Sequence, residues 1–464
     1  MDSLKKSNKK TRDMTEGSPF RHIVGFALPM LLGMLLQQLY NVVDTMVVGR
    51  LLGVEALAGV GATGSINFMI IGFCTGLGAG FALPVANSFG AKDYGAMRKY
   101  VGNGIWLSVV LGLLLTFLST WFCKDILILM GTPDDIFSHS YQYIFIILAG
   151  IPVTYVYNYL AGLIRALGNS RTPVYFLMIS TAVNILLDIL SVVVFGMGVS
   201  GPAMATLISQ GVSVLLCYVY ILKRMDLLHL CRSDLIPNGR MMGRLLGFGL
   251  PMGLQYSITA IGSLVMTSAV NSLGSTYVAA HAAAGKVAVF VACPFDALGG
   301  TMANYVGQNA GANRIDRIKR GVGIAMLIGS IYAIVIFFLL IALGGTFVTL
   351  FVDGAQTVII ESAHLLLVMY SSTYVLLAAV NVYRFSLQGM GYSALAMIAG
   401  ALEMVGRGLT GLWLVPVFGF VAVGLASPLA WVFASMFLIP AFFVCCKRLQ
   451  KKRMLHDSDF NRSL

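Results

Sequence analysis

Residues 25–53 read GFALPMLLGMLLQQLYNVVDTMVVGRLLG, a stretch long enough to cross a bilayer that nevertheless carries polar residues at its centre. Gln37, Asn41 and Asp44 are spaced i, i+4 and i+7, which predicts that they share one face of a helix. A carboxylate inside hydrocarbon costs roughly 2.5 to 3.5 kcal/mol, so such residues usually face a bundle interior or a water-filled cavity. Asp44 is therefore the first functional candidate in the chain.

The same opening recurs 222 residues further along the chain. Residues 247–274 read GFGLPMGLQYSITAIGSLVMTSAVNSLG, in which Pro251 matches Pro29 and Met266 takes the place of Asp44. A second pair of segments, VANSFGAKDYGAMRK and VGQNAGANRIDRIKR, repeats at a similar distance, at residues 85–99 and 306–320. A loop has no hydropathy reason to repeat itself, so the chain is predicted to be a doubled unit whose halves differ in charge.

The composition indicates a polytopic membrane protein. Of 464 residues, 58% are hydrophobic and 11% are charged, more apolar than a water-soluble core requires. The net charge of +12 is spread over short segments between apolar runs, so the chain is not expected to bind nucleic acid. The seven cysteines contain no CxxC pair, and neither a disulfide framework nor a cysteine metal site is predicted.

Twelve apolar segments of spanning length are predicted, six in each half of the chain. They are residues 23–48, 56–88, 100–122, 138–166, 174–197, 200–222, 247–272, 277–308, 321–350, 358–388, 394–417 and 421–446.

Alternate connections hold 27 of the 31 Lys and Arg residues, so by the positive-inside rule both termini are expected in the cytoplasm. We therefore expect a multi-pass protein of the cell membrane. Its predicted parts are a basic tail (1–22), an N-terminal lobe (23–222), a linker (223–246), a C-terminal lobe (247–446) and a second basic tail (447–464).

Charge within the predicted spans differs between the two halves. Apart from Arg165, next to the end of the fourth span, the spans of the first half contain Asp44 and Asp188 but no basic residue. Those of the second half contain both signs: Asp296, Glu403, Lys286 and Arg407. Glu403 and Arg407 are one helical turn apart, which predicts an ion pair between them. The first pair has no such partner and is predicted to bind the driving ion, because two carboxylates at low dielectric need a proton or a metal cation.

Neutral oxygen donors accompany this acidic pair. Asn184 lies one turn before Asp188, and Asn158 and Thr206 lie on neighbouring spans. These oxygens suit Na⁺ and a hydrogen-bonded proton site equally well, so H⁺ and Na⁺ are both expected candidates. Asp44 and Asp188 would be metal ligands only with Na⁺. The other polar residues on the spans are candidates for lining a cavity: Gln37, Asn41, Gln255, Asp296, Lys286, Glu403 and Arg407.

Five motifs in order along the chain resemble the multidrug and toxic compound extrusion (MATE) family of cation-coupled transporters. They are the GFALPM/GFGLPM openings, the NSFGAKD/GQNAGAN pair, RALGNSRTP (165–173), NILLD (184–188) and GVSGPAMAT (198–206). The resemblance spans roughly residues 20–445 and implies an all-α membrane fold of two six-helix lobes related by a pseudo-two-fold axis, around a cavity that opens alternately to each side. It also implies a cation site at Asp44, Asn158, Asn184, Asp188 and Thr206, and a helix hinge at Pro29. Acidic residues that other members carry on the seventh and tenth helices are absent here.

The predicted function is that of an antiporter, expected to be a monomer in the lipid bilayer, which expels lipophilic or cationic drugs in exchange for H⁺ or Na⁺. A flippase for lipid-linked saccharides is the first alternative, but it needs a strongly basic cavity, whereas the predicted intramembrane charge is net negative by two. A polytopic membrane enzyme is the second alternative, and it needs a catalytic cluster at a membrane face. The six histidines are scattered without HExxH spacing. We therefore expect no enzymatic activity and no cofactor besides the coupling ion.

Overall fold

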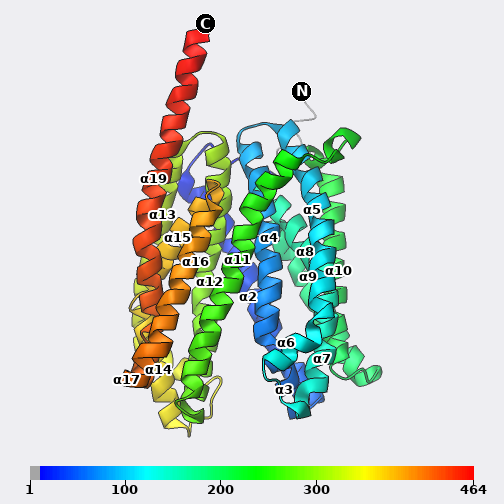
Figure 1. The fold of residues 1–464 in the computed structure, drawn as a ribbon, viewed down its shortest axis with the longest axis vertical. Coiled ribbons are helices and arrows are strands. Elements are labelled where there is room, and N and C mark those ends of the chain that lie inside the picture. Colours follow the sequence, from blue (N-terminus) through cyan, green and yellow to red (C-terminus); the bar gives the residue numbers. More distant parts are fainter. Residues whose placement is uncertain (1–10, 464) are drawn as a thin grey trace. The chain divides into compact units, whose positions relative to one another are not determined.

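The computed structural model describes the backbone of residues 11–463 and the side chains of residues 11–451. Within this part of the chain all regular structure is helical, as Figure 1 shows. The apolar runs form helices because a backbone in hydrocarbon must satisfy every N–H and C=O group within its own segment. The chain divides into two compact units, each of which is described by itself.

The first unit comprises residues 11–13 and Leu28–Gly253. Its helices are α2 (Pro19–Leu51) from Leu28 onward, α3 (Val54–Ala62), α4 (Gly64–Gly90), α5 (Tyr94–Trp121), α6 (Cys123–Leu129), α7 (Asp134–Ala149), α8 (Ile151–Ala166), α9 (Arg171–Ile189), α10 (Ser200–Arg224) and the beginning of α11 (Gly239–Asn271). A π-helical turn, Leu190–Val194, extends α9, and two 3-10 turns, Asp226–Leu228 and Arg232–Leu235, follow α10. The core centres on Phe81, whose ring meets those of Tyr155 and Tyr159 edge to face.

The second unit comprises Met14–Ala27 and residues 254–463. Its helices are the first turns of α2, the remainder of α11, α12 (Ser275–Gly311), α13 (Ile315–Val348), α14 (Thr357–Ser371), α15 (Tyr374–Gly389), α16 (Ser393–Leu409), α17 (Val415–Phe418), α18 (Phe420–Val423) and α19 (Ala426–Ser463). A second π-helical turn, Thr410–Leu414, extends α16 as the first one extends α9. Helices α2 and α11 thus contribute residues to both units. The lobe boundaries expected at residues 222 and 247 stay a prediction.

The helices account for the predicted spans. Among the described residues, nine helices are long and apolar enough to cross a membrane, and two bent pairs raise the number to eleven. These pairs are α7 with α8, bent by 47°, and α14 with α15, bent by 52°. Helix α11, with 33 residues, is the twelfth of spanning length, and its Gln, Ser and Thr residues make it less apolar than the others.

The second predicted span, residues 56–88, consists of two helices, α3 and α4, which meet at Thr63. The glycines of α4 between Gly72 and Gly80 permit close packing within the first unit. A Cβ at Gly76 would lie 2.5 Å from the carbonyl oxygen of Met252, and one at Gly80 would lie 2.5 Å from the Cα of Gly249. The repeated glycines of α4 and α11 therefore set the distance between these two helices.

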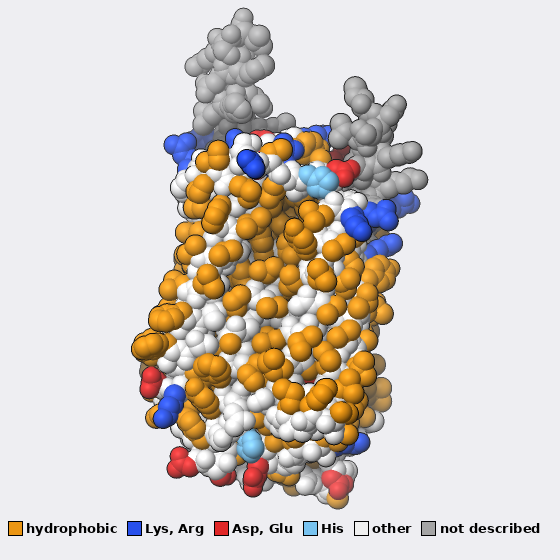
Figure 2. All heavy atoms as spheres, turned by 90° about the vertical axis from the view of Figure 1, so that its right-hand side faces the viewer, with side chains coloured by type: hydrophobic (Ala, Val, Ile, Leu, Met, Phe, Trp, Pro, Cys, Tyr) orange, Lys and Arg blue, Asp and Glu red, His pale blue; other side chains and the backbone are white. Residues whose placement is uncertain are grey.

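The surface fits a lipid environment. On the face shown in Figure 2, hydrophobic side chains cover the middle and Lys and Arg side chains gather at one end. On α5, for example, Leu113 and Phe117 are 60% and 59% exposed. Exposed apolar area on this scale is uncommon in soluble monomers, and here it belongs to helices of spanning length.

Candidate functional site

Two acidic side chains meet inside the first unit. Asp44 of α2 is 9% exposed and Asp188 of α9 is 0% exposed, and their carboxyl groups lie within hydrogen-bonding contact. Two ionised carboxylates have no donor between them, so their contact is favourable only when a proton or a cation is shared. The pair therefore has the chemistry of a site that takes up and releases positive charge.

Three buried oxygen atoms in and around this pair accept no hydrogen bond from an N–H group or a hydroxyl of the described residues. They are Oδ1 of Asp44, Oδ2 of Asp188 and Oδ1 of Asn184. The Asn184 amide donates from Nδ2 to the other Asp188 oxygen, at 3.4 Å, which leaves its own oxygen free to bind a cation. Buried polar atoms without partners are rare, and oxygen atoms are the ligands that hard cations prefer. The site thus fits either a proton or a small hard cation.

Two tyrosines border the acidic pair, and the sequence analysis did not single them out. The Tyr40 hydroxyl lies 2.8 Å from Oγ1 of Thr206, a contact that joins α2 to α10. Tyr143 of α7 is 6% exposed and lies within electrostatic range of Asp44 and Asp188. The available signal for Tyr40 was its position one turn before Asp44, on the same helical face.

Asn158, Gln37 and Asn41 make no described contact with the acidic pair. Nδ2 of Asn158 donates to the carbonyl of Thr154, at 2.9 Å, and no described contact joins Asn158 to either carboxyl group. Gln37 and Asn41 are exposed, whereas the buried side of α2 carries Asp44 and Val48. Their roles in cation binding or in lining a cavity stay predictions.

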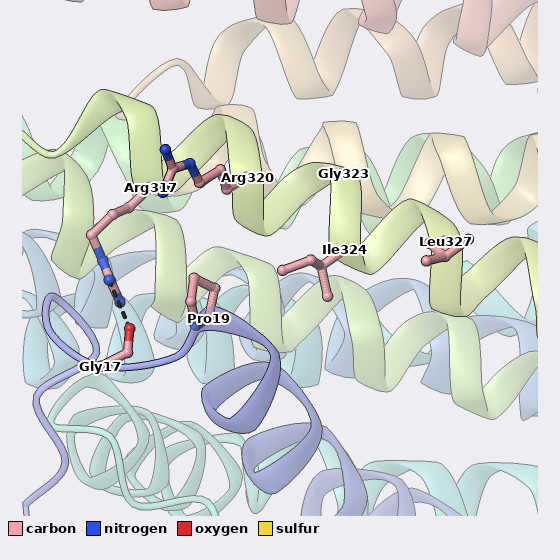
Figure 3. Close-up of a pocket in the computed structure, with 7 residues that line it drawn as sticks. All are labelled: Gly17, Pro19, Arg317, Arg320, Gly323, Ile324 and Leu327. Carbon is pink, nitrogen blue, oxygen red and sulfur yellow. Dashed lines mark hydrogen bonds between the residues drawn. The ribbon is translucent and has the colours of Figure 1, made fainter.

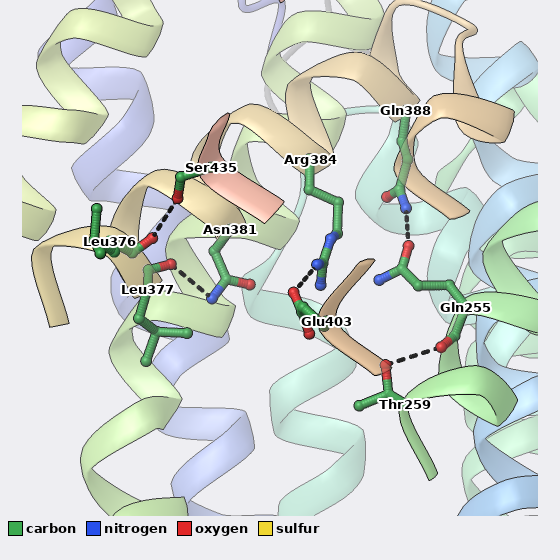
Figure 4. Close-up of polar contacts among 9 residues, drawn as sticks. All are labelled: Gln255, Thr259, Leu376, Leu377, Asn381, Arg384, Gln388, Glu403 and Ser435. Atoms are coloured by element: carbon green, nitrogen blue, oxygen red, sulfur yellow. Dashed lines mark hydrogen bonds and ion pairs between the residues drawn. The ribbon is translucent and has the colours of Figure 1, made fainter. Parts of the chain in front are cut away.

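The second unit contains an ion pair that differs from the expected one. Glu403 of α16 pairs with Arg384 of α15, not with Arg407, and both partners are buried, at 3% and 7% exposed (Figure 4). The prediction of a Glu403–Arg407 pair was wrong because helical spacing indicates only partners on the same helix, whereas Arg384 reaches Glu403 from the neighbouring helix α15. Adding Arg384 to the predicted intramembrane charges changes their sum from net negative by two to net negative by one.

Polar side chains of α15 form one stripe in Figure 4. Asn381, Arg384 and Gln388 follow at i, i+3 and i+7, a spacing that signals a shared helical face. Nε2 of Gln388 donates to Oε1 of Gln255 on α11, at 2.8 Å. Nη1 of Arg407 is buried without a hydrogen-bond partner among the described residues. Gln255 is thus a buried structural contact, and Arg384 is the residue that sequence reasoning missed.

The two remaining charged candidates are on α12. Asp296 is exposed, and it lies within electrostatic range of Arg384 and Glu403. Lys286 lies over the ring of Phe351, 5.5 Å from its centroid. No group of three or more His, Cys, Asp or Glu residues in the described part of the chain is arranged to hold a metal ion. The acidic pair of the first unit is therefore the arrangement best suited to bind a cation.

The doubled organisation of the chain finds its match in a known family. The MatE family model matches residues 29–190 and 251–410, one segment in each half of the chain. The chain belongs to the MatE family. It is thus a MATE transporter and a multi-pass membrane protein.

Individual relatives of this MATE transporter cover most of its length. The probable multidrug resistance protein YoeA of Bacillus subtilis (strain 168) is 30% identical over 388 residues, 82% of this chain and 83% of YoeA. The multidrug export protein MepA of Staphylococcus aureus (strain MSSA476) is 23% identical over 393 residues, 83% of this chain and 86% of MepA. The crystal structure of a MATE protein in complex with MaL6 aligns with a TM-score of 0.88 at 22% identity, covering 95% of this chain and 99% of that one. The predicted all-α fold of twelve spans is confirmed by this match.

Pro29 lies within the first spanning helix of the MATE transporter, α2. It lies inside the continuous helix α2, one residue after Leu28, where the chain passes from the second unit to the first. Proline lacks an N–H donor and clashes with the preceding turn, so the helix is weakest at this position. The same helix carries Asp44 about four turns further on. A hinge at Pro29 remains a prediction.

Proposed function

We propose that this MATE transporter is a cation-coupled antiporter that exports lipophilic or cationic compounds in exchange for H⁺ or Na⁺. The observation that supports it most is the set of three buried oxygens that no described donor reaches, on Asp44, Asp188 and Asn184. The substrate class is supported by the relatives named above, which are described as multidrug resistance and multidrug export proteins.

The coupling follows from differential affinity. A ligand shifts a conformational equilibrium only if it binds one state more tightly than another. An ion that neutralises Asp44 and Asp188 removes the repulsion between them and changes how α2 packs against α9. If the drug favours the arrangement that the ion disfavours, the two ligands compete through α2, and an inward ion gradient drives drug export.

The residues fit both coupling ions. A proton would sit between the carboxyl groups of Asp44 and Asp188, with Asn184 accepting or donating beside it. Na⁺ would be held by the carboxylate oxygens and the Asn184 amide oxygen, because hard cations bind oxygen ligands. The choice between the ions therefore rests on measurement.

Transport by the purified chain in proteoliposomes tests the proposal. Vesicles loaded with a fluorescent lipophilic cation are given an imposed pH gradient, an imposed Na⁺ gradient, or neither. We expect efflux to accelerate with one of the two gradients and to stop when an ionophore collapses it. Efflux that ignores both gradients would contradict the coupling. Movement of a lipid-linked saccharide across the same vesicles, without drug efflux, would favour the flippase instead.

The two alternative functions have less support among the described residues. A flippase for pyrophosphate-linked saccharides requires a strongly basic cavity, whereas the charges on the predicted spans sum to net negative and the buried Arg384 is already paired with Glu403. A membrane enzyme requires a catalytic cluster, and the acidic pair has no nucleophile with an adjacent base beside it. We accordingly propose transport without catalysis.

The hinge at Pro29 makes a separate prediction. Pro29→Ala restores a backbone donor in α2 and stiffens the helix between its two ends. We expect the variant to bind a fluorescent drug with unchanged affinity at low ion concentration. The antagonism between drug and ion should weaken, because a stiffer helix transmits less of the change at Asp44. The coupling free energy is measured by titrating the drug at several ion concentrations.

Pro440→Ala is the matched control, since Pro440 also lies inside a long helix, α19, which carries neither Asp44 nor Asp188. It should leave the antagonism at the wild-type value. Equal antagonism in Pro29→Ala and in the wild type would remove support for the hinge and leave the acidic site itself intact.

A further inference from the structure

A pocket of about 450 Å³ lies at the beginning of α13, outside the site described above. One wall is the helix itself, and the other is the segment that leads into α2 (Figure 3). The residues that line it are Gly17, Pro19, Arg317, Arg320, Gly323, Ile324 and Leu327, all of the second unit. The pocket thus combines two arginines with an apolar helix face.

Arg317 fixes the wall formed by the N-terminal segment. Its guanidinium donates to the backbone carbonyls of Gly17, Met14 and Glu16, at 2.8, 3.0 and 3.2 Å. It also donates from Nε to Oδ1 of Asn309, at 3.1 Å. Gly17 has a φ of +76°, a conformation that favours glycine. These four acceptors are neutral oxygens, which hold the guanidinium in place without cancelling its charge.

Arg320 supplies a second positive charge at the mouth of the pocket. It is exposed, and no described residue forms an ion pair with it, although Asp316 lies one turn before it on α13. In Figure 3 its side chain extends back toward the start of the helix, where Arg317 lies. The two arginines are i and i+3, and so lie on the same helical face.

The same face becomes apolar further along α13. Gly323, Ile324 and Leu327 follow Arg320 at the spacing of one helical stripe, and Leu327 is 62% exposed. A Cβ added at Gly323 meets no atom within 4 Å, so the groove is open at this point. Helix α13 is the most apolar of the candidate spans, so the stripe on it continues into the hydrocarbon region. Charge at the membrane boundary and an open apolar groove below it match the two parts of a phospholipid.

We propose that this pocket binds an anionic phospholipid, with its phosphate at Arg317 and Arg320 and an acyl chain along Gly323, Ile324 and Leu327. Basic pockets between membrane helices at the boundary recognise anionic head groups, and each basic residue near the surface contributes attraction. The bound lipid packs the N-terminal segment against α13, because that segment forms the opposite wall. The lipid belongs to the leaflet on the side where Arg317 and Arg320 lie, which the positive-inside rule predicts to be the cytoplasmic side.

Native mass spectrometry of the full chain in detergent tests the head-group contact. The protein is titrated with phosphatidylglycerol and, separately, with phosphatidylcholine, and the fraction carrying one lipid gives an apparent Kd. We expect tighter binding of phosphatidylglycerol and about fivefold weaker binding in Arg320→Gln. Lys319→Gln is the matched control, because it removes an equal charge from the same turn of α13 without lining the pocket. Equal affinity for the two lipids, or equal loss in the two variants, would overturn the proposal.

The acyl groove is tested with Gly323→Phe, which fills open space and leaves both arginines in place. We expect it to weaken phosphatidylglycerol binding about as strongly as Arg320→Gln, while Gly243→Phe, an added ring at another open helical glycine, changes nothing. Soluble sn-glycerol 3-phosphate distinguishes a lipid site from a free-anion site. If it binds as tightly as phosphatidylglycerol, or if Gly323→Phe binds the lipid normally, the pocket is an anion site and not a lipid site.

Discussion

Asp44→Asn or Asp188→Asn should reduce gradient-driven drug efflux to the level of vesicles without protein. Each substitution keeps the size of the side chain but removes one of the two groups that can take up and release a proton or hold a cation. The remaining carboxyl group no longer has a charged neighbour, so it does not need the driving ion for the site to be stable. The drug then has no coupling ion to exchange with, and efflux in proteoliposomes falls to background.

The folded state should tolerate both substitutions. Removing one carboxyl group from a buried pair relieves repulsion and desolvation, so expression and the thermal unfolding midpoint are expected to equal or exceed those of the wild type. Drug binding measured by fluorescence should persist without its dependence on ion concentration. Asp135→Asn, on the exposed first turn of α7, removes a carboxylate outside the pair and should transport normally. Ion-coupled efflux at the wild-type rate in either pair variant would reject the acidic pair as the coupling site.

Glu403→Gln should destabilise the second unit strongly, because it leaves the buried Arg384 without its counter-charge. Removing one partner of a buried ion pair costs about 3 to 5 kcal/mol. The expected result is a lower yield of folded protein and a lower thermal unfolding midpoint, both measured by fluorescence-detected size-exclusion chromatography. Transport per folded molecule should fall much less than the yield.

The double variant Glu403→Gln with Arg384→Gln separates this pair from the one suggested by helical spacing. It removes both charges together, so most of the lost stability should return. Glu403→Gln combined with Arg407→Gln should not recover, because Arg384 still lacks a partner. Recovery in the second double variant instead of the first would mean that Arg407 is the functional partner of Glu403.

The sequence alone placed the helices and the acidic pair. Hydropathy determines where a chain can cross a bilayer, because backbone groups in hydrocarbon must pair within their own helix. A carboxylate in such a span is costly enough to be noticed without a structure, and so Asp44 and Asp188 were found. The duplicated openings, which contain Pro29 and Pro251, were visible because each is a continuous string of residues that can be compared directly.

Contacts between helices were beyond the reach of the sequence. The Glu403–Arg384 pair joins α16 to α15, and helical spacing can predict only partners on one helix, which favoured Arg407. Tyr40 reaches Thr206 across 166 positions of chain, and only the packing of α2 against α10 shows this contact. The division of the second predicted span into α3 and α4 at Thr63 was likewise not predicted from the sequence.

Sequence therefore determined the number and type of the spans and the two carboxylates, because each is fixed by the cost of exposing a residue to hydrocarbon. It also showed the duplication, because the repeated residues follow one another in the same order in both halves. The tertiary structure decided which charges are paired, which buried oxygens remain without a partner, and that Gly17 and Pro19 face Arg317 and Arg320 across a pocket. These features depend on distances between segments far apart in the chain. One helix's sequence records which face it buries, but not which side chain of another helix meets it there.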